Sequence, residues 1–266
     1  ISEPQFRLLL RSIERMSELS PRHRECLLAL YIVAFRAGLR LGEILKLRLR
    51  DIEQGQELLV EIRNTRLDDG KSASATRRIH LGVLLTEDER QRLDAYLSPL
   101  WSRIKQSTQA LAFPSEQGVL IPLTPAEVTG PLTSLLQQIT GVHLTIHHLR
   151  HTALSRLQLV LHHAVLGIHH WSGWQHFLPW NAKQCEQIRQ VIAYGHGRAD
   201  YWGLAEFAGH LTPETTLNNY LHFSDLVSAA CLTQARHDWD PAIRHYFTGQ
   251  SQATLQKLGW MQGCLT

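Results

Sequence analysis

One long apolar segment, CLLALYIVAFRAG at 26–38, constrains the fold more than any other feature of the chain. The dipeptide Ser20-Pro21 is typical of a helix start, and Gly38 interrupts the pattern at the other end. We therefore expect a long apolar helix that other elements must cover. A chain of 266 residues is long enough to bury a substantial core of this kind.

Helical and strand-like patterns surround this segment. Residues 4–18 carry apolar side chains at close to a 3.6-residue period, and LGEILKLRL, DERQRLDAYLSPLWSRI and PLTSLLQQI predict further helices. LLVEIRNT and ATRRIHLG are strand-like and flank a polar turn at Asp68-Asp69-Gly70, which predicts a β-hairpin. The expected fold class is α+β, predominantly α-helical, with a small antiparallel hairpin or sheet.

Composition narrows the class of protein. No stretch approaches the roughly 20 apolar residues that cross a bilayer, and the opening ISEPQF has no features of a signal peptide. A formal net charge of +3 permits nucleic-acid binding without requiring it. The four cysteines are widely spaced and form no CxxC pair: Cys26, Cys185, Cys231 and Cys264. This spacing argues against a disulfide framework or a thiolate zinc site and suits a cytoplasmic protein.

Two segments each place an arginine beside a group that could orient it or act with it. In AGLRLGEILKLRLRDI, Arg40 and Glu43 are three residues apart on one predicted helical face, so the carboxylate can orient the guanidinium. The alternative is a solvated surface ion pair. In TIHHLRHTALSRL, His147 and Arg150 project together from a helix start, and His148 is expected to point elsewhere. Imidazole exchanges protons near neutral pH and guanidinium binds phosphate through two hydrogen bonds, whereas the alternative is a polar helix face without a site.

A third segment, FAGHLTPETTLNNYLHFSD, places His210 ten residues before Tyr220. Thr212-Pro213-Glu214 is typical of a helix start, so Tyr220 is expected about two turns along that helix. Tyrosine can act as a nucleophile if a neighbour accepts its proton. A helical tyrosine taken alone is more often a packed amphipathic side chain.

Taken together, these segments resemble the catalytic domain of the tyrosine recombinases, the phage-integrase family. AGLRLGEILKLRLRDI resembles the segment with the family's first catalytic arginine, IHHLRHT resembles the H-x-x-R-H box, and AGHLTPETTLNNYLH resembles the segment that ends in the nucleophile. GKSASATRRIHL resembles the lysine-bearing hairpin, where Lys71 is the best candidate and Arg66 the alternative. The resemblance implies the catalytic set Arg40, Lys71, His147, Arg150, His210 and Tyr220, with Glu43 in support.

The resemblance also implies a domain plan. It covers about residues 1–225, and the 60 residues between Arg150 and His210 exceed the family's usual spacing, which predicts an insertion at about 161–203. Residues 226–266 would form a helical tail that either docks on a neighbouring protomer or stays solvated. The family's N-terminal core-binding domain is expected to be absent from this chain, because the resemblance starts at residue 1.

The implied activity is site-specific DNA recombination. Tyr220 would attack the scissile phosphate and form a 3′-phosphotyrosine intermediate, Arg40 and Arg150 would stabilise the transition state, and Lys71 would protonate the leaving 5′-oxygen. His147 would accept a proton or bind the phosphate, and His210 would donate to it. The implied partner is a double-stranded recombination site bound by a homotetramer, with no cofactor, no metal and no membrane.

Three other functions remain open at this stage. A topoisomerase-like enzyme would use the same nucleophile and rejoin the original strand, and a DNA-binding protein could keep these motifs after losing cleavage. A metal-binding module is the third: His162/His163 and His169/His170 are seven residues apart, so they would share a face on a continuous helix.

Overall fold

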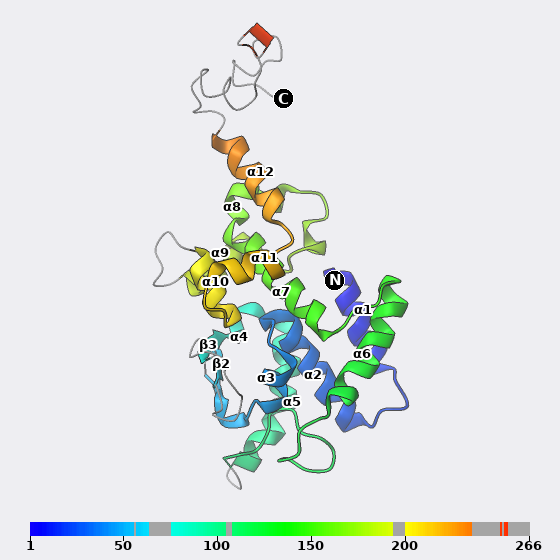
Figure 1. Ribbon diagram of the computed structural model, residues 1–266. Coiled ribbons are helices and arrows are strands. Elements are labelled where there is room, and N and C mark those ends of the chain that lie inside the picture. Colours follow the sequence, from blue (N-terminus) through cyan, green and yellow to red (C-terminus); the bar gives the residue numbers. More distant parts are fainter. Residues whose placement is uncertain are drawn as a thin grey trace.

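The computed structural model describes residues 1–55, 57–63, 76–104, 108–193, 200–235, 251 and 253–254. Helices dominate, and one small sheet lies beside them (Figure 1). The helices are α1 Glu3–Glu14, α2 Pro21–Ala37, α3 Leu41–Lys46, α4 Leu81–Leu84, α5 Glu87–Ile104, α6 Pro125–Thr140, α7 Ile146–Leu161, α8 His163–Leu166, α9 Ala182–Ala193, α10 Asp200–Ala208, α11 Pro213–Tyr220 and α12 Ser224–Ala235. Short 3₁₀ turns cover Leu49–Asp51, Ile168–His170 and Trp174–His176.

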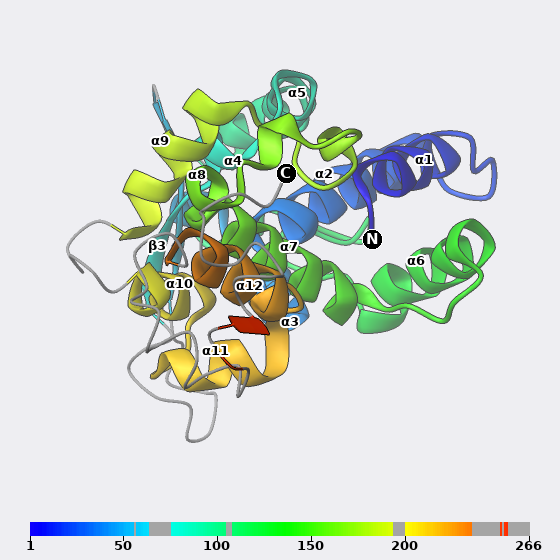
Figure 2. The same ribbon diagram turned by 90° about the horizontal axis from the view of Figure 1, so that it is seen from above.

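The long apolar segment forms α2, as predicted. The Ser20 side chain accepts a hydrogen bond from the His23 amide at the start, and Gly38 ends the helix with φ 61°. Every residue from Cys26 to Ala37 is buried. Helix α7 packs against α2 and lies in the middle of the molecule, with α1 and α6 on one side and α10 and α11 on the other (Figure 2).

The predicted hairpin is present as two strands of a three-stranded antiparallel sheet. β2 (Leu58–Ile62) pairs with β3 (Arg77–His80), with Val60 opposite Ile79 and Ile62 opposite Arg77. The sequence patterns did not predict β1 (Ile52–Gln54), which pairs with the other edge of β2. The predicted turn at 68–70, with Arg66 and Lys71, lies outside the described residues.

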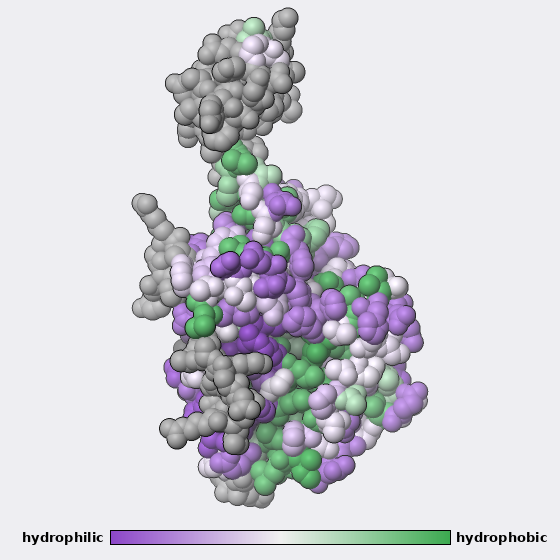
Figure 3. All heavy atoms as spheres, in the orientation of Figure 1, coloured by the Kyte–Doolittle hydropathy of each residue, from purple (hydrophilic) through white to green (hydrophobic). Residues whose placement is uncertain are grey.

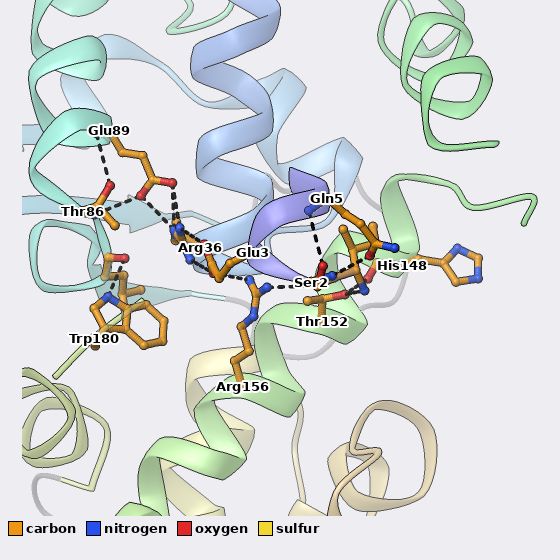
Figure 4. Close-up of polar contacts among 12 residues, drawn as sticks. Ser2, Glu3, Gln5, Arg36, Thr86, Glu89, His148, Thr152, Arg156 and Trp180 are labelled. Carbon is orange, nitrogen blue, oxygen red and sulfur yellow. Dashed lines mark hydrogen bonds and ion pairs between the residues drawn. The ribbon is translucent and has the colours of Figure 1, made fainter. Parts of the chain in front are cut away.

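A buried network of charged side chains ties α1, α2, α5 and α7 together (Figure 4). Arg36 makes two-pronged contacts with both Glu3 and Glu89, and Arg156 approaches Glu3 at 3.0 Å. All four side chains are less than 10% exposed. The charges balance, because two guanidinium groups face two carboxylates, and this balance makes their burial tolerable.

The segment 161–203, predicted as an insertion, contributes to the core of this chain. Trp180 is 2% exposed and donates from Nε1 to the carbonyl of Leu84, and Cys185 on α9 is fully buried. Gly167 ends α8 with φ 56°, so the two histidine pairs do not lie on one continuous helix. The break excludes the predicted shared face of one helix, although the rings of His163 and His169 still lie 5.9 Å apart.

The predicted boundary between residues 225 and 226 falls inside α12, which packs against α8. Val227 on α12 is 5% exposed, so the first part of the predicted tail packs on its own chain. Among the described residues, no helix combines the length and the apolar character that a membrane span requires.

Candidate active site

Arg40 and Glu43 form the predicted pair, although their geometry differs from the prediction. Arg40 precedes the first turn of α3 in an extended conformation, and the Glu43 carboxylate accepts from its backbone amide at 2.8 Å. The same carboxylate contacts Nη1 of Arg40 at 3.0 Å. The two residues are thus joined by helix capping rather than by a shared helical face, and the Arg40 side chain remains 38% exposed.

Arg150 is the fifth residue of α7 and is only 1% exposed. Its Nη1 donates to the carbonyl of Gly38, and its Nη2 donates to the carbonyl of Ala208 and to Nε2 of His210. Among the residues that the structure describes, none forms a hydrogen bond with its buried Nε. A buried guanidinium with only neutral hydrogen-bond partners keeps its full positive charge available to an anion. Desolvation, with the nearby Arg40 charge, lowers the pKa of Arg150 to about 10.

His210 is fixed on both ring nitrogens. Because an arginine can only donate, Nε2 of His210 must accept from Arg150, and Nδ1 therefore carries the proton that it donates to Thr216 Oγ1 at 2.8 Å. Desolvation and the charges of Arg150 and Arg40 lower the pKa of His210 to about 4. The imidazole is thus neutral at pH 7, and its Nε2 would donate to a phosphate only after releasing Arg150 and gaining a proton.

Tyr220 is the last residue of α11, which begins after Thr212 as predicted. Its ring lies 5.0 Å below the Arg150 guanidinium and 4.9 Å from the His210 ring. Ser155 on α7 fixes the end of this helix, because its hydroxyl donates to the Tyr220 carbonyl and accepts from the His222 amide. The nucleophile candidate is therefore anchored on α7, the helix that carries Arg150.

A row of imidazoles covers the other side of Tyr220. The rings of His147 and His151 lie 5.6 and 4.7 Å from the Tyr220 ring, and Nδ1 of His151 contacts Nε2 of His222 at 3.1 Å. Desolvation, followed by the charge of Arg150, lowers the pKa of His147, so its imidazole is neutral at pH 7 and able to accept a proton. His148 instead contacts the Thr145 amide at the start of α7 and so points elsewhere, as expected.

Three arginines from distant parts of the chain meet at the carboxyl end of α10. The backbone carbonyls of Phe207, Ala208 and Gly209 each accept a hydrogen bond from one of these arginines. The donors are Arg77, Arg150 and Arg40, respectively. The carboxyl end of a helix carries partial negative charge, which reduces the repulsion among the cations. Hydrophilic side chains gather between α11 and α3 on this face, beside a hydrophobic band that extends downward (Figure 3).

Solved structures share this architecture. XerA recombinase matches over 89% of this chain with a TM-score of 0.51 and 17% identity. The XerH site-specific recombinase matches in two complexes. The post-cleavage complex with palindromic difH matches 87% of this chain with a TM-score of 0.53 and 15% identity. The pre-cleavage complex with difH matches 86% of this chain with a TM-score of 0.51 and 16% identity. The chain has the tyrosine recombinase fold. It spans 63% of the XerA chain and 51% of each XerH chain. No sequence-family model and no curated protein matches it.

In this tyrosine recombinase fold, five of the six predicted catalytic residues come together with Glu43: Arg40, His147, Arg150, His210 and Tyr220. They arrive from α3, α7, α11 and the loop after α10. Lys71, the sixth, and Arg66, its alternative, belong to the segment outside the described residues.

Sequence reasoning missed three residues of this cluster: Arg77, His151 and His222. Arg77 sits in the strand ATRRIHLG beside an equally basic neighbour, and the alternation of the strand, which puts Arg77 on the face of the apolar Ile79, was a usable signal. His151 and His222 lie inside the motif segments IHHLRHT and AGHLTPETTLNNYLH. His151 directly follows Arg150, and His222 is two residues after Tyr220, which was a usable signal.

His151 and His222 also line an apolar cavity of about 400 Å³ that extends to Phe177 and Phe223. Desolvation, with the neighbouring imidazoles, lowers the pKa of His151 to about 4.

The histidines of the 162–170 segment have other partners. His162 contacts the Tyr201 hydroxyl, His163 contacts Glu186, and His169 contacts the carbonyl of Trp180. In the part of the chain that the structure describes, no group of three or more His, Cys, Asp or Glu side chains could hold a metal ion.

Proposed function

We propose that this chain is the catalytic domain of a site-specific tyrosine recombinase that breaks and rejoins DNA. The observation that carries the proposal is the Arg150 guanidinium, which is buried beside the Tyr220 ring and hydrogen-bonded to two carbonyls and one neutral imidazole. A buried cation of this kind is suited to an anion that arrives from outside the protein. A phosphate next to a tyrosine hydroxyl fits both groups.

The local charge supports the same conclusion. Arg40, Arg77 and Arg150 share one nearby carboxylate, Glu43, so these four groups carry two surplus positive charges. A DNA phosphodiester carries one negative charge and gains a second in the pentacoordinate transition state. Fixed donors aimed at such a developing charge can each contribute about 3 kcal/mol to catalysis.

In the proposed mechanism, Arg40 and Arg150 bind the non-bridging oxygens of the scissile phosphate while Tyr220 attacks the phosphorus in line. His147, whose lowered pKa keeps it neutral, accepts the proton that the Tyr220 hydroxyl loses as it attacks. The bond from phosphorus to the 5′-oxygen breaks, and Lys71 gives that oxygen a proton. The 3′-phosphotyrosine bond conserves the energy of the broken bond, so a 5′-hydroxyl from a partner strand can reverse the step without ATP or metal.

The partner in this proposal is a double-stranded recombination site, bound by a homotetramer on paired sites. The fold shared with XerH, whose structures contain a difH substrate, supports a DNA partner. Phosphate contacts release condensed counterions, so DNA affinity should fall steeply as salt rises.

A covalent capture experiment tests the proposal. The protein is mixed with a pool of nicked duplexes of randomised sequence, from which the short 5′-hydroxyl fragment diffuses away after cleavage and traps the protein–DNA adduct. The unmodified protein should yield an adduct that survives denaturing electrophoresis, and Tyr220→Phe should bind the duplexes without forming one. Tyr201→Phe is the matched control, because Tyr201 is a half-buried helical tyrosine bonded to Gln158 and His162 outside the cluster. An adduct from Tyr220→Phe, or none from the unmodified protein, would overturn the assignment.

A further inference from the structure

Arg77 is a buried cation near the candidate active site that the mechanism above leaves without a role. It is the first residue of β3, opposite Ile62, and its side chain is 2% exposed. The next residue, Arg78, points to the other face of the strand, where its side chain is 56% exposed and 3.6 Å from Glu53. Burial removes the hydration of a guanidinium, so Arg77 depends on its protein partners to remain charged there.

One of those partners, Glu43, also holds Arg40. Nη1 and Nη2 of Arg77 donate to the two oxygens of Glu43 at 3.0 and 2.9 Å, and Nε donates to the carbonyl of Phe207 at 2.8 Å. Oε1 of Glu43 is shared, because Nη1 of Arg40 also contacts it at 3.0 Å. Arg77 thus grips both oxygens of the carboxylate that orients Arg40. Burial alone would raise the pKa of Glu43, but the hydrogen bonds and charges of Arg77 and, to a smaller extent, of Arg40 outweigh it and hold this pKa at about 2.

Gly209 lets both arginines approach the end of α10. Its φ is +69°, and a Cβ built on it would lie 2.7 Å from Nη1 of Arg77 and 3.3 Å from Nη1 of Arg40. Any larger residue would therefore displace these guanidinium groups as well as strain the backbone. The glycine provides the space in which Arg77, Glu43 and Arg40 meet.

We propose that Arg77 is a positioning residue for the proposed cleavage reaction, holding the Glu43 carboxylate and, through it, Arg40 at the phosphate site. The inference rests on the proposed function only for its effect on cleavage. Without the two-pronged grip of Arg77, Glu43 is free to change rotamer and Arg40 loses the fixed acceptor that directs it. Lysine cannot replace this grip, because its single ammonium group lacks the planar fork of a guanidinium.

The competing explanation is that Arg77 only fastens the sheet to α10. That role predicts that an Arg77 variant is less stable and that it slows cleavage independently of Arg40. The factors by which the two single variants slow cleavage would then multiply in the double variant. Positioning predicts instead that the two residues act as one unit, so that the Arg77 defect disappears once Arg40 is gone. A double-mutant cycle distinguishes these outcomes.

The experiment measures the rate of adduct formation with the nicked duplex pool for Arg77→Lys, Arg40→Ala and the double variant, with Arg78→Lys as the charge-matched neighbour. Arg77→Lys should slow cleavage by about 10²-fold, the cost of a small misplacement of a catalytic group. In the Arg40→Ala background the same change should alter the rate by no more than about twofold. Arg78→Lys should match the unmodified protein. Defects that multiply would overturn the proposal.

A second measurement needs no activity. NMR relaxation of the Arg40 Nε–Hε group, assigned with Arg40→Lys, reports the order of that side chain in the folded protein. Order should fall in Arg77→Lys and stay unchanged in Arg78→Lys, and unchanged order in Arg77→Lys would refute positioning. If the unmodified protein forms no adduct, the proposed function fails, whereas this measurement still decides the role of Arg77.

Gly209→Ala gives an independent perturbation of the same contact. Its matched control is Gly141→Ala, at another helix end with φ +74°, where no atom of the described part of the chain lies within 4 Å of the added Cβ. Both changes strain the backbone, but only Gly209→Ala should lower Arg40 order and slow cleavage. Equal behaviour of the two variants would contradict the model.

Discussion

Nη2 of Arg150 donates to Nε2 of His210 over 3.2 Å, although 60 residues separate the two in the chain. The contact fixes the tautomer of His210, because an arginine offers no acceptor. It also gives one buried cation a neutral partner, so the positive charge of Arg150 stays available to a phosphate. The candidate active site therefore depends on an interaction between α7 and the loop after α10.

The hydrogen bond between His210 and Thr216 should contribute measurably to stability. Thr216 is fully buried, and Thr216→Val would leave the Nδ1 proton of His210 without an acceptor at nearly constant volume. We expect the free energy of unfolding to fall by about 1–3 kcal/mol. Urea denaturation measures it. The exposed neighbour provides the control, since Thr215→Val should stay within about 0.5 kcal/mol, and equal losses would contradict the prediction.

Stability should depend on the protonation of His210. Its pKa is about 4 in the folded chain and close to the unperturbed value of about 6.5 when unfolded, so the unfolded state binds more protons between these values. The free energy of unfolding should therefore fall as pH drops from about 7 to about 4. Urea titrations at several pH values give the slope of the unfolding free energy against pH. For His210→Gln this slope should be smaller, by the amount that corresponds to the uptake of up to about one proton on unfolding. Parallel curves would show that His210 does not contribute.

The buried network around Arg36 should be sensitive to the loss of one partner. Arg36→Met would leave the carboxylates of Glu3 and Glu89 buried without the positive charge that pairs with both of them. We expect the free energy of unfolding to fall by about 3–5 kcal/mol. Arg92→Met removes a cation that is 33% exposed and paired with Glu14, so it should cost at most about 1 kcal/mol. Similar losses in urea denaturation for both variants would contradict this account.

Local patterns predicted the elements well because the interactions that produce them are local. Ser20-Pro21 and Gly38 bounded α2, Thr212 bounded α11, and the alternating strands around residue 60 gave the hairpin. The predicted helix LGEILKLRL does begin at Leu41, but Arg40 and Glu43 do not share a helical face as predicted, because Arg40 precedes the helix and Glu43 caps it. Spacing alone cannot distinguish a side chain that caps a helix from one on its surface, since both bring residues three apart together.

The site itself was predicted only as a list of residues. The motif resemblance selected Arg40, His147, Arg150, His210 and Tyr220, and the fold brings these five together. Arg77 was not selected, although the alternation of β3 places it on the face of the apolar Ile79 and Arg78 on the other face. The tertiary contact between Arg77 and Glu43 gives the buried arginine its link to Arg40, and no local pattern predicts that contact.

The sequence by itself determined which segments become helices and strands, where several of them begin and end, and which side chains of suitable chemistry they carry. These features follow from contacts between residues a few positions apart. The tertiary structure decided that three arginines share the end of α10, that Arg150 has neutral partners, and that Arg77 rather than Arg78 reaches Glu43. Such contacts join residues 34 to 169 positions apart, and only the packing of whole elements around α2 and α7 brings them together.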